Sequence, residues 1–277
     1  MKKNIEQEKA IAQLEGPVIL ISCPGSGKTT TLLRRINHML EVGIPPEKIL
    51  MITFTKAAAQ EMSVKFKKKF GEPNGITFST IHALCLKILM TYGGLSAENI
   101  IKTSDQWKFL LETARKCQSV CDPAKAAGNF QMLYSAAMNN RMSPSEVNPK
   151  DIKGISRKDF LFMSEEYRRM KERTGYIDFD DMLVKAYELM TGNPQVLRQL
   201  RERWDYIQVD EYQDVNYLQR DLVYLLAGEK KNLCVAGDDD QSIYRFRGAR
   251  PELMLGFPRE FQEAKQYLLG INYRCPD

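Results

Sequence analysis

The 277-residue sequence has no long apolar run and no disulfide framework. Its apolar runs, such as "VILI" at residues 18–21, are far too short to cross a bilayer. The N-terminal stretch "MKKNIEQEKAIAQLEG" does not contain the apolar core of a secretion signal. Six cysteines are scattered along the chain, and no second pair accompanies Cys117 and Cys121 to complete a metal site. These absences favour a cytoplasmic protein with reduced thiols and no membrane partner.

The composition is that of an ordinary globular protein, with 43% hydrophobic and 27% charged residues. The length allows one large domain or two modest ones. A formal net charge of +5 permits a polyanionic partner but does not require one. Composition alone therefore indicates no particular function.

Apolar segments bounded by turn residues predict strands at 18–22, 48–54, 75–80, 206–211 and 233–238. Between several of these segments, apolar residues recur at helical spacing. After Lys28 they fall on one face, and Gly43 is a suitable end for that helix. Strands that are apolar throughout and alternate with helices indicate a parallel sheet covered on both faces. The predicted fold class is therefore α/β.

Residues 92–202 have a different pattern, because amphipathic helices follow one another there without a strong strand between them. We expect a mostly helical subdomain over this range. It would be inserted into an α/β domain made of residues 1–91 and 203–277.

The stretch "SCPGSGKTT" at 22–30 nearly fits the phosphate-loop pattern G-x-x-x-x-G-K-[ST], with Ser22 in place of the first glycine. Such a loop needs a buried strand, a tight glycine-rich turn, and a helix whose first N–H groups face phosphate oxygens. Here "VILIS", "CPGSG" and "KTTTLLRRI" supply these parts in order. Lys28 is then expected to reach the β- and γ-phosphates, and the Thr29 hydroxyl to bind Mg²⁺. The alternative is a strand–turn–helix packing motif without a ligand.

A second motif, "YIQVDEYQDVN" at 206–216, ends an apolar strand in adjacent carboxylates. Asp210 is expected to hold Mg²⁺, directly or through water, and Glu211 to orient and deprotonate the attacking water. An acidic turn after a strand is common by itself. It is much less common in a chain that also contains "GSGKT", so the two motifs together predict a magnesium–nucleotide site.

With these motifs in this order, the sequence resembles the UvrD/PcrA/Rep group of superfamily 1 DNA helicases over nearly its whole length. A small residue commonly opens the phosphate loop in this family, and Ser22 fits that version. The other segments that carry the resemblance are "NIEQEKAI" (4–11, the Q motif), "TFTKAAAQEM" (53–62), "STIHAL" (79–84, motif Ib), "YIDFDDML" (176–183), "VDEYQDVN" (209–216, motif II), "VAGDDDQSIYRFRGA" (235–249, motif III) and "GINYRC" (270–275, motif IV).

The resemblance implies a RecA-like P-loop NTPase domain (1A, residues 1–91 and 203–277) with the inserted helical subdomain (1B, residues 92–202). It implies ATP and Mg²⁺ as cofactors, and single-stranded DNA or a junction of single and double strands as partner. The family motor contains a second RecA-like domain whose motifs are absent from this sequence. We therefore expect the N-terminal half of a larger 3′-to-5′ helicase, with little activity of its own.

The resemblance also assigns residues to the nucleotide site. It implies that Gln7 and the Tyr273 ring hold the adenine, that Gln241 senses the γ-phosphate, and that Arg274 neutralises charge on the transferred phosphoryl group. The expected nucleotide-binding residues are Gln7, Ser22, Gly25, Ser26, Gly27, Lys28, Thr29, Thr30 and Tyr273. The expected catalytic residues are Lys28, Asp210, Glu211, Gln241 and Arg274. Thr30 stands where some relatives have a basic residue, so looser base selectivity is expected.

For DNA, the family stacks bases on aromatic rings at the positions of Phe54, Tyr244 and Phe246. Thr53, Thr80 and His82 are expected to touch phosphate or sugar. Considered alone, Phe54 would be a core residue, and His82 is about as well explained as a histidine at the start of a helix. The sequence departs from the family at Lys56 and Ala57, which replace asparagine and lysine, and at Arg245 and Phe246, which replace glycine and tryptophan.

Three functions remain open at this point. The leading one is an ATP-driven single-strand DNA translocase and helicase. The second is the front part of a helicase–nuclease fusion, and the third is a nucleotide-gated nucleic-acid-binding module without motor activity. Intact Lys28, Asp210 and Glu211 argue against a degenerate relative that has lost hydrolysis.

Overall fold

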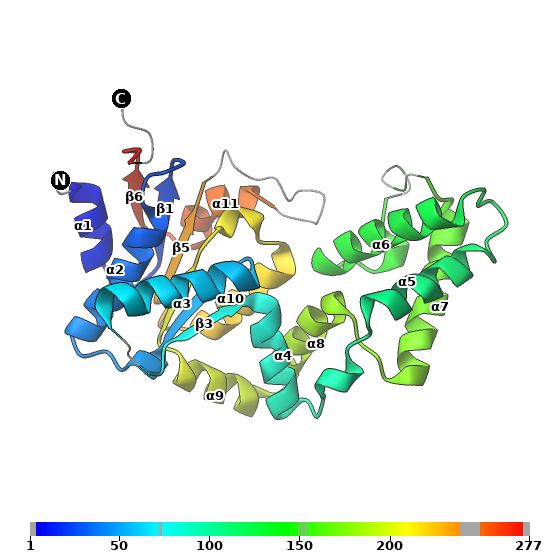
Figure 1. The fold of residues 1–277 in the computed structure, drawn as a ribbon, viewed down its shortest axis with the longest axis horizontal. Helices are drawn as coiled ribbons and strands as arrows, with labels where there is room; N and C mark the ends of the chain where they lie inside the picture. The colour runs from blue at the N-terminus through cyan, green and yellow to red at the C-terminus, as the bar shows by residue number, and fades with distance from the viewer. Residues whose placement is uncertain are drawn as a thin grey trace.

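The computed structural model describes residues 4–71, 74–148, 150, 152, 154–238 and 250–273. In Figure 1 the sheet and the helices that cover it lie at the left, and a second group of helices lies at the right. Several residues predicted for the site lie outside the described part of the chain: Gln241, Tyr244, Arg245, Phe246 and Arg274.

A six-stranded parallel sheet in the order β3-β2-β4-β5-β1-β6 forms the centre of the first group. The strands are β1 (Val18–Ser22), β2 (Ile49–Thr53), β3 (Thr77–Thr80), β4 (Tyr206–Val209), β5 (Leu233–Gly237) and β6 (Lys265–Leu269). Strands β2 and β5 are buried throughout, as expected for a parallel sheet covered on both faces. The predicted α/β class is therefore confirmed.

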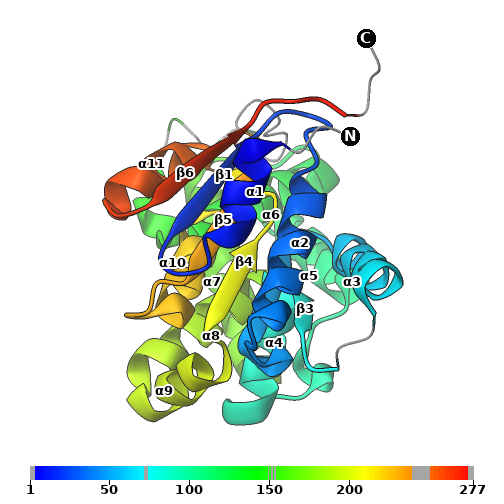
Figure 2. The same cartoon turned by 90° about the vertical axis from the view of Figure 1, so that its left-hand side faces the viewer.

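Strand β6 was not predicted from the sequence. Among the strands that the structure describes it pairs with β1 alone, at the edge of the sheet, and most of its side chains are accessible to solvent. An edge strand of this kind has no continuous apolar run for a sequence pattern to detect. Figure 2 shows β6 beside β1 at one edge of the sheet and β3 at the other.

Successive residues of each strand face opposite sides of the sheet. Val18 and Leu20 pack against α1 (Ile5–Ala12), α2 (Lys28–Glu41) and α3 (Lys56–Phe70), whereas Ile19 faces the core on the other side. That second core is covered by α4 (Ile81–Tyr92), α8 (Phe179–Gly192), α9 (Pro194–Arg203), α10 (Tyr217–Ala227) and α11 (Glu252–Glu260). We call the sheet and these helices the α/β lobe.

Polar side chains fix where several helices begin. Thr55 and Thr80 accept the backbone N–H groups of Ala58 and Ala83 at the starts of α3 and α4. Asn216 and Gln219 form a capping box at the start of α10. At the other end of α2, Gly43 has a left-handed φ of 88°, in agreement with the predicted helix end.

Helices α5 (Thr103–Ala114), α6 (Pro123–Asn139) and α7 (Arg157–Thr174) form a second group, which we call the helical lobe. They share a core of their own, centred on Phe130, Phe160 and Tyr167. The described residues between 101 and 174 form helices and turns and no strand. No helix in the described ranges is long and apolar enough to span a membrane.

The range 92–202 contains two packing environments. Helices α8 and α9 belong to it by sequence, but their apolar faces lie in the core beneath the sheet, as at Leu183 and Leu200. The chain passes between the lobes at two adjacent points. Ile100 and Ile177 form a parallel bridge there, in which Ile177 donates its N–H to Asn99 O at 2.8 Å.

The separate core of the helical lobe leads to a prediction about Phe160→Ala. Phe160 is fully buried, so its truncation should lower the free energy of unfolding of this lobe by about 3–5 kcal/mol. Hydrogen exchange should show lost protection in α5–α7 and retained protection in β1 and β5. Phe162→Ala is the control, since Phe162 lies on the same helix and is 39% exposed. Equal loss of protection in both lobes would contradict the prediction.

Candidate nucleotide site and nucleic-acid cleft

The loop after β1 has the backbone that the glycines predict. Gly25 and Gly27 have φ values of 74° and 81°, in the left-handed region where a side chain is strained. Gly27 is also crowded, because a Cβ there would lie 3.0 Å from Gln7 Nε2. The loop is therefore closed to larger residues at the position just before Lys28, where α2 begins.

Ser22 has a structural partner of its own. Its buried hydroxyl donates a hydrogen bond of 2.8 Å to Gly237 O at the end of β5. The hydroxyl thus ties the ends of neighbouring strands together, which a glycine at this position could not do.

The two residues expected on the adenine side lie together above the loop. Gln7 Nε2 donates to Ser26 O at 2.9 Å, and the Tyr273 N–H donates to Gly25 O at 2.9 Å. Asn4 Nδ2 also donates to the Tyr273 hydroxyl at 3.1 Å. The Tyr273 side chain stays 40% exposed. Residues from both ends of the described chain thus meet at the phosphate loop.

Lys28 lies between the two predicted carboxylates. Its Nζ is 2.5 Å from Glu211 Oε2 and 3.3 Å from Asp210 Oδ1. Burial by itself lowers the pKa of Lys28, but Asp210 and Glu211 outweigh it and raise this pKa above the ordinary lysine value. Burial raises the pKa of Asp210, and the charge of Lys28 opposes that shift. Lys28 is therefore a firmly charged ammonium group at the carboxyl edge of the sheet.

Glu211 has an unusual backbone for a residue with a side chain. Its φ of 54° lies in the left-handed region, a conformation that costs about 1–3 kcal/mol and occurs most often at functional sites. The Glu211 N–H donates to Asp210 Oδ1 at 3.0 Å. Gln213 Nε2 donates to Glu211 Oε2 at 2.8 Å, and Gln213 Oε1 accepts the Asp238 N–H at 3.1 Å. This role of Gln213 was not predicted from the sequence, although the residue lies inside the "DEYQD" motif.

Thr30 is exposed on the first turn of α2. It lines a cavity of about 350 Å³ together with Leu33 and three lysines of α3, namely Lys65, Lys68 and Lys69. Although position 30 itself is not basic, basic side chains from another helix lie beside it.

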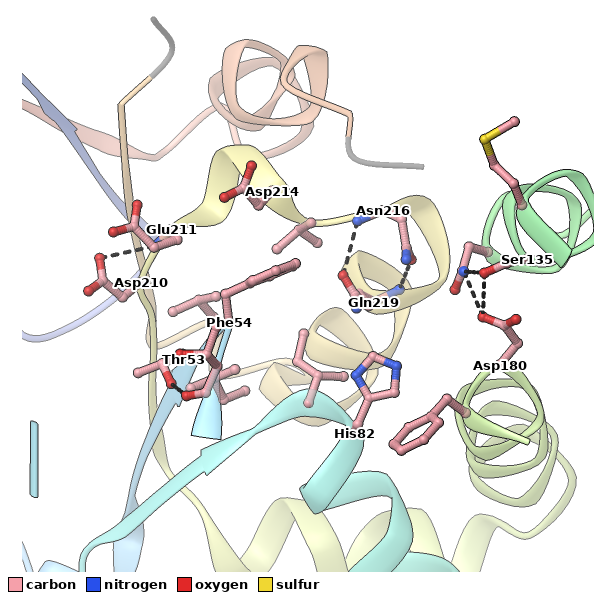
Figure 3. A pocket seen from close by; sticks show the side chains of 18 of the residues that line it. Thr53, Phe54, His82, Ser135, Asp180, Asp210, Glu211, Asp214, Asn216 and Gln219 are labelled. Atoms are coloured by element: carbon pink, nitrogen blue, oxygen red, sulfur yellow. Dashed lines mark hydrogen bonds between the residues drawn. The ribbon is translucent and has the colours of Figure 1, made fainter. Parts of the chain in front are cut away.

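A cleft of about 650 Å³ begins at Asp210 and Glu211 and extends between the two lobes. Figure 3 shows Thr53, Phe54 and His82 near the ends of β2 and β3, with Ser135 of α6 and Asp180 of α8 across from them. The cleft thus brings together three residues predicted for DNA contact and the two predicted catalytic carboxylates.

The protein residues predicted to contact DNA have different surroundings. Thr53 is buried, and its hydroxyl donates to Thr55 O at 3.0 Å. Thr80 lines a neighbouring cavity of about 740 Å³ rather than the cleft, and its hydroxyl caps α4. His82 lines both cavities, and burial lowers the pKa of its imidazole, which is therefore neutral near pH 7.

The inserted segment contributes an apolar wall to the cleft that was not predicted from the sequence. Phe179 is 57% exposed. Its ring packs edge-on against the His82 ring, with 6.1 Å between the two ring centres. Met132 of α6 also lines the cleft and is 47% exposed. Phe179 lies in the quoted segment "YIDFDDML", so a signal was present, whereas nothing in the sequence singled out Met132.

Besides Asp210, two further carboxyl groups of the cleft have raised pKa values. Asp180 accepts hydrogen bonds of 2.9 Å from Ser135 and Asn139, but burial and then the charge of Asp178 raise its pKa to about 6. Burial and then Glu211 raise the pKa of Asp214 to about 6.

Comparison with known proteins now gives the family. A model described as the UvrD/REP helicase N-terminal domain matches residues 3–262. The chain belongs to this family. Its fold is accordingly the RecA-like α/β domain that the resemblance implied, and the predicted family membership is confirmed.

Individual UvrD/REP relatives match along nearly the whole chain. YjcD of Bacillus subtilis (strain 168) is 36% identical over 280 residues, which cover 98% of this chain and 36% of that protein. Proteins named ATP-dependent DNA helicase PcrA from Staphylococcus epidermidis (strain RP62A) and Staphylococcus aureus (strain Mu50) are each 35% identical over 277 residues, which cover 98% of this chain and 38% of theirs. The chain thus spans a little over a third of the length of these relatives.

The raised pKa of Asp180 predicts how stability depends on pH. A carboxyl group whose pKa rises from 3.8 to about 6 on folding stabilises the protein fully below pH 3.8, and this contribution is lost as the pH rises through about 6. Asp180→Asn cannot titrate. The stability of this variant relative to the natural protein should therefore increase by roughly 1–3 kcal/mol between about pH 4 and pH 7.

Urea unfolding at the two pH values measures this difference. Asp105→Asn, at an exposed position, is the control and should show no such change. A pH-independent difference for Asp180→Asn would mean that the carboxyl group is not perturbed by the fold.

Proposed function

We propose that this chain is the ATP-binding N-terminal part of an ATP-dependent DNA helicase that translocates along single-stranded DNA. The observation that carries the proposal is the position of the cleft, which begins at the two carboxylates beside Lys28 and runs between the lobes. The carboxylates proposed for ATP hydrolysis therefore lie at one end of the cleft that we propose binds the DNA strand. By analogy with the family, the direction of movement is 3′ to 5′.

The phosphate loop fits a nucleotide on two observations. The Ser26 hydroxyl is buried and has no hydrogen-bond partner among the residues that the structure describes. Helix α2 begins at Lys28, and the preceding Gly27 has no side chain to cap it, so that the first turn can donate N–H groups to an anion. Both features supply donors where a phosphate group would lie.

In this proposal Lys28 exchanges its carboxylate partners for the β- and γ-phosphates. Thr29 and Asp210 are the residues that would hold Mg²⁺, and the bound ion supplies charge neutralisation at the phosphates. Glu211, oriented by Gln213, deprotonates the attacking water. Gln7 and Tyr273 contact the adenine from the side of α1 and β6.

Further roles are proposed from the resemblance for residues outside the described part of the chain: Gln241 and Arg274 at the nucleotide, and Tyr244 and Phe246 at the DNA. We also propose that residues 92–202 act as the inserted subdomain 1B of the family, with α8 and α9 packed on the sheet of 1A. The ATP-binding domain 1A then consists of 1–91 and 203–277.

For the single strand, we propose that bases stack in the cleft on Phe54, Phe179 and the neutral His82 ring. All three rings line the cleft, and Phe179 is the exposed one of the three, so together they offer the sequence-independent surface that such binding needs. Thr53 lines the cleft and Thr80 the neighbouring cavity, and we propose that both contact sugar or phosphate groups. Their hydroxyls already have partners within the protein, so we assign their contacts to the strand a minor part of the affinity.

Glu211→Gln tests the nucleotide site in the full-length protein. Loss of a general base should lower the rate of strand-stimulated ATP hydrolysis about 10²–10⁴-fold, with ATP still bound. The control is Glu263→Gln, because Glu263 pairs with Lys231 on the surface. Hydrolysis at the natural rate in Glu211→Gln, or a natural protein that single-stranded DNA does not stimulate, would refute the proposed function.

Phe179→Ala tests the cleft. Removal of the ring should weaken binding of a fluorescent single-stranded oligonucleotide by about 1–3 kcal/mol, because stacking contributes that much per base. Phe162→Ala removes a partly exposed phenylalanine of the helical lobe that does not line the cleft, and should leave affinity unchanged. Unchanged affinity in Phe179→Ala would remove the stacking role of this residue.

A further inference from the structure

Three successive residues at the C-terminal end of α6 contact three separate parts of the α/β lobe. Asn139 Nδ2 donates to Asp180 Oδ1 on α8 at 2.9 Å. Asn140 Oδ1 accepts from Arg250 Nε, before α11, at 3.1 Å. Arg141 Nη1 donates to Asp221 Oδ2 on α10 at 2.7 Å. We call residues 139–141 the α6 turn.

The backbone of the α6 turn has a conformation usually given to glycine. Arg141 has a φ of 58°, and its N–H bonds to Met138 O while the Met142 N–H bonds to Ala137 O at 2.9 Å. This is the Schellman pattern, in which glycine normally occupies the left-handed position. An arginine there is strained, but its side chain makes the ion pair with Asp221 and lies 4.5 Å from the centre of the Tyr187 ring. The strain is offset by contacts between the lobes.

Arg250, the partner of Asn140, also contacts residues next to the carboxylate motif. Its guanidinium group lies 5.5 Å from the centre of the Tyr217 ring, and its backbone N–H donates to Val215 O at 3.0 Å. Val215 belongs to the same short segment as Glu211, because η5 (Tyr212–Asp214) joins them. Arg250 thus connects the α6 turn to the segment that holds Glu211.

Inside that segment the backbone hydrogen bonds run back to Glu211. The Val215 N–H donates to Tyr212 O at 3.2 Å, and the Asp214 N–H donates to Glu211 O at 3.0 Å. Because Glu211 has a left-handed backbone, its orientation depends on the residues that hold this turn. A shift at Val215 would therefore act on the carboxylate.

We propose that Asn140 and Arg250 are positioning residues, which couple a single strand in the cleft to the orientation of Glu211. The inference rests on the proposed function, since it requires a strand between α6 and the sheet. Met132 of α6 lines the cleft, so a bound strand pushes on the helix whose end is held by Arg250. Asn140 and Arg250 themselves do not line the cleft.

The test is a double-mutant cycle in the full-length protein, with Asn140→Ala, Arg250→Gln and the combined variant. Steady-state ATP hydrolysis is measured without DNA and with increasing oligodeoxythymidylate. The readouts are the basal rate, the maximal stimulated rate and the KM for ATP. Asn140→Asp keeps an acceptor for Arg250 and tests rescue, and Arg168→Gln disrupts ion pairs confined to α7 as a control.

Each single variant should lower the maximal stimulated rate by about 2- to 30-fold, the range over which such residues modulate coupling. The basal rate and the KM for ATP should stay unchanged. The combined variant should be no slower than the slower single variant, because both substitutions break one contact. Asn140→Asp should restore stimulation, and Arg168→Gln should resemble the natural protein.

The inference would be overturned by any of three results. The losses of stimulated rate in the two single variants could multiply in the combined variant, the basal rate could fall together with the stimulated rate, or stimulation could be unchanged in both single variants. In these cases stimulation of the natural protein shows that the proposed function itself stands. A natural protein without strand-stimulated hydrolysis would refute the proposed function and the inference with it.

Discussion

The ammonium group of Lys28 holds together two parts of the chain that are far apart in sequence. It meets Asp210 and Glu211 at the carboxyl edge of a parallel sheet, where β5 lies between the two strands that carry them. Lys28 and Asp210 are largely buried, and a buried charge is tolerated only if it has a partner of opposite charge. The loop conformation, the strand order and the strained backbone at Glu211 all serve this one arrangement.

The sequence predicted the parts of this arrangement that depend on local chemistry. A glycine before Lys28, a buried strand before Asp210 and a small residue at Ser22 are requirements of the backbone, and backbone requirements leave short patterns. The α/β class followed for the same reason, because β2 and β5 are apolar along their whole length. These features could be found without knowing which segments lie side by side.

Features that depend on distant contacts were not predictable in the same way. Met132 becomes part of a cleft only because α6 lies opposite the sheet, and its own helix gives no sign of this. Helices α8 and α9 have the same amphipathic pattern as α5–α7, so the pattern could not show that they pack beneath the sheet. Gln213 connects Glu211 to Asp238, and that role exists only once β4 and β5 are neighbours.

The bridge between Ile100 and Ile177 has a consequence for how such proteins diversify. The chain leaves the α/β lobe near Ile100 and returns to it near Ile177, which lies beside Ile100. The segment between them is therefore an insertion whose two ends are adjacent in space. The length and helix content of this segment can change without altering the strand order or the distance in space between Lys28 and the two carboxylates. A domain built in this way can gain, enlarge or replace one wall of its cleft while the residues at the carboxyl edge of its sheet stay the same.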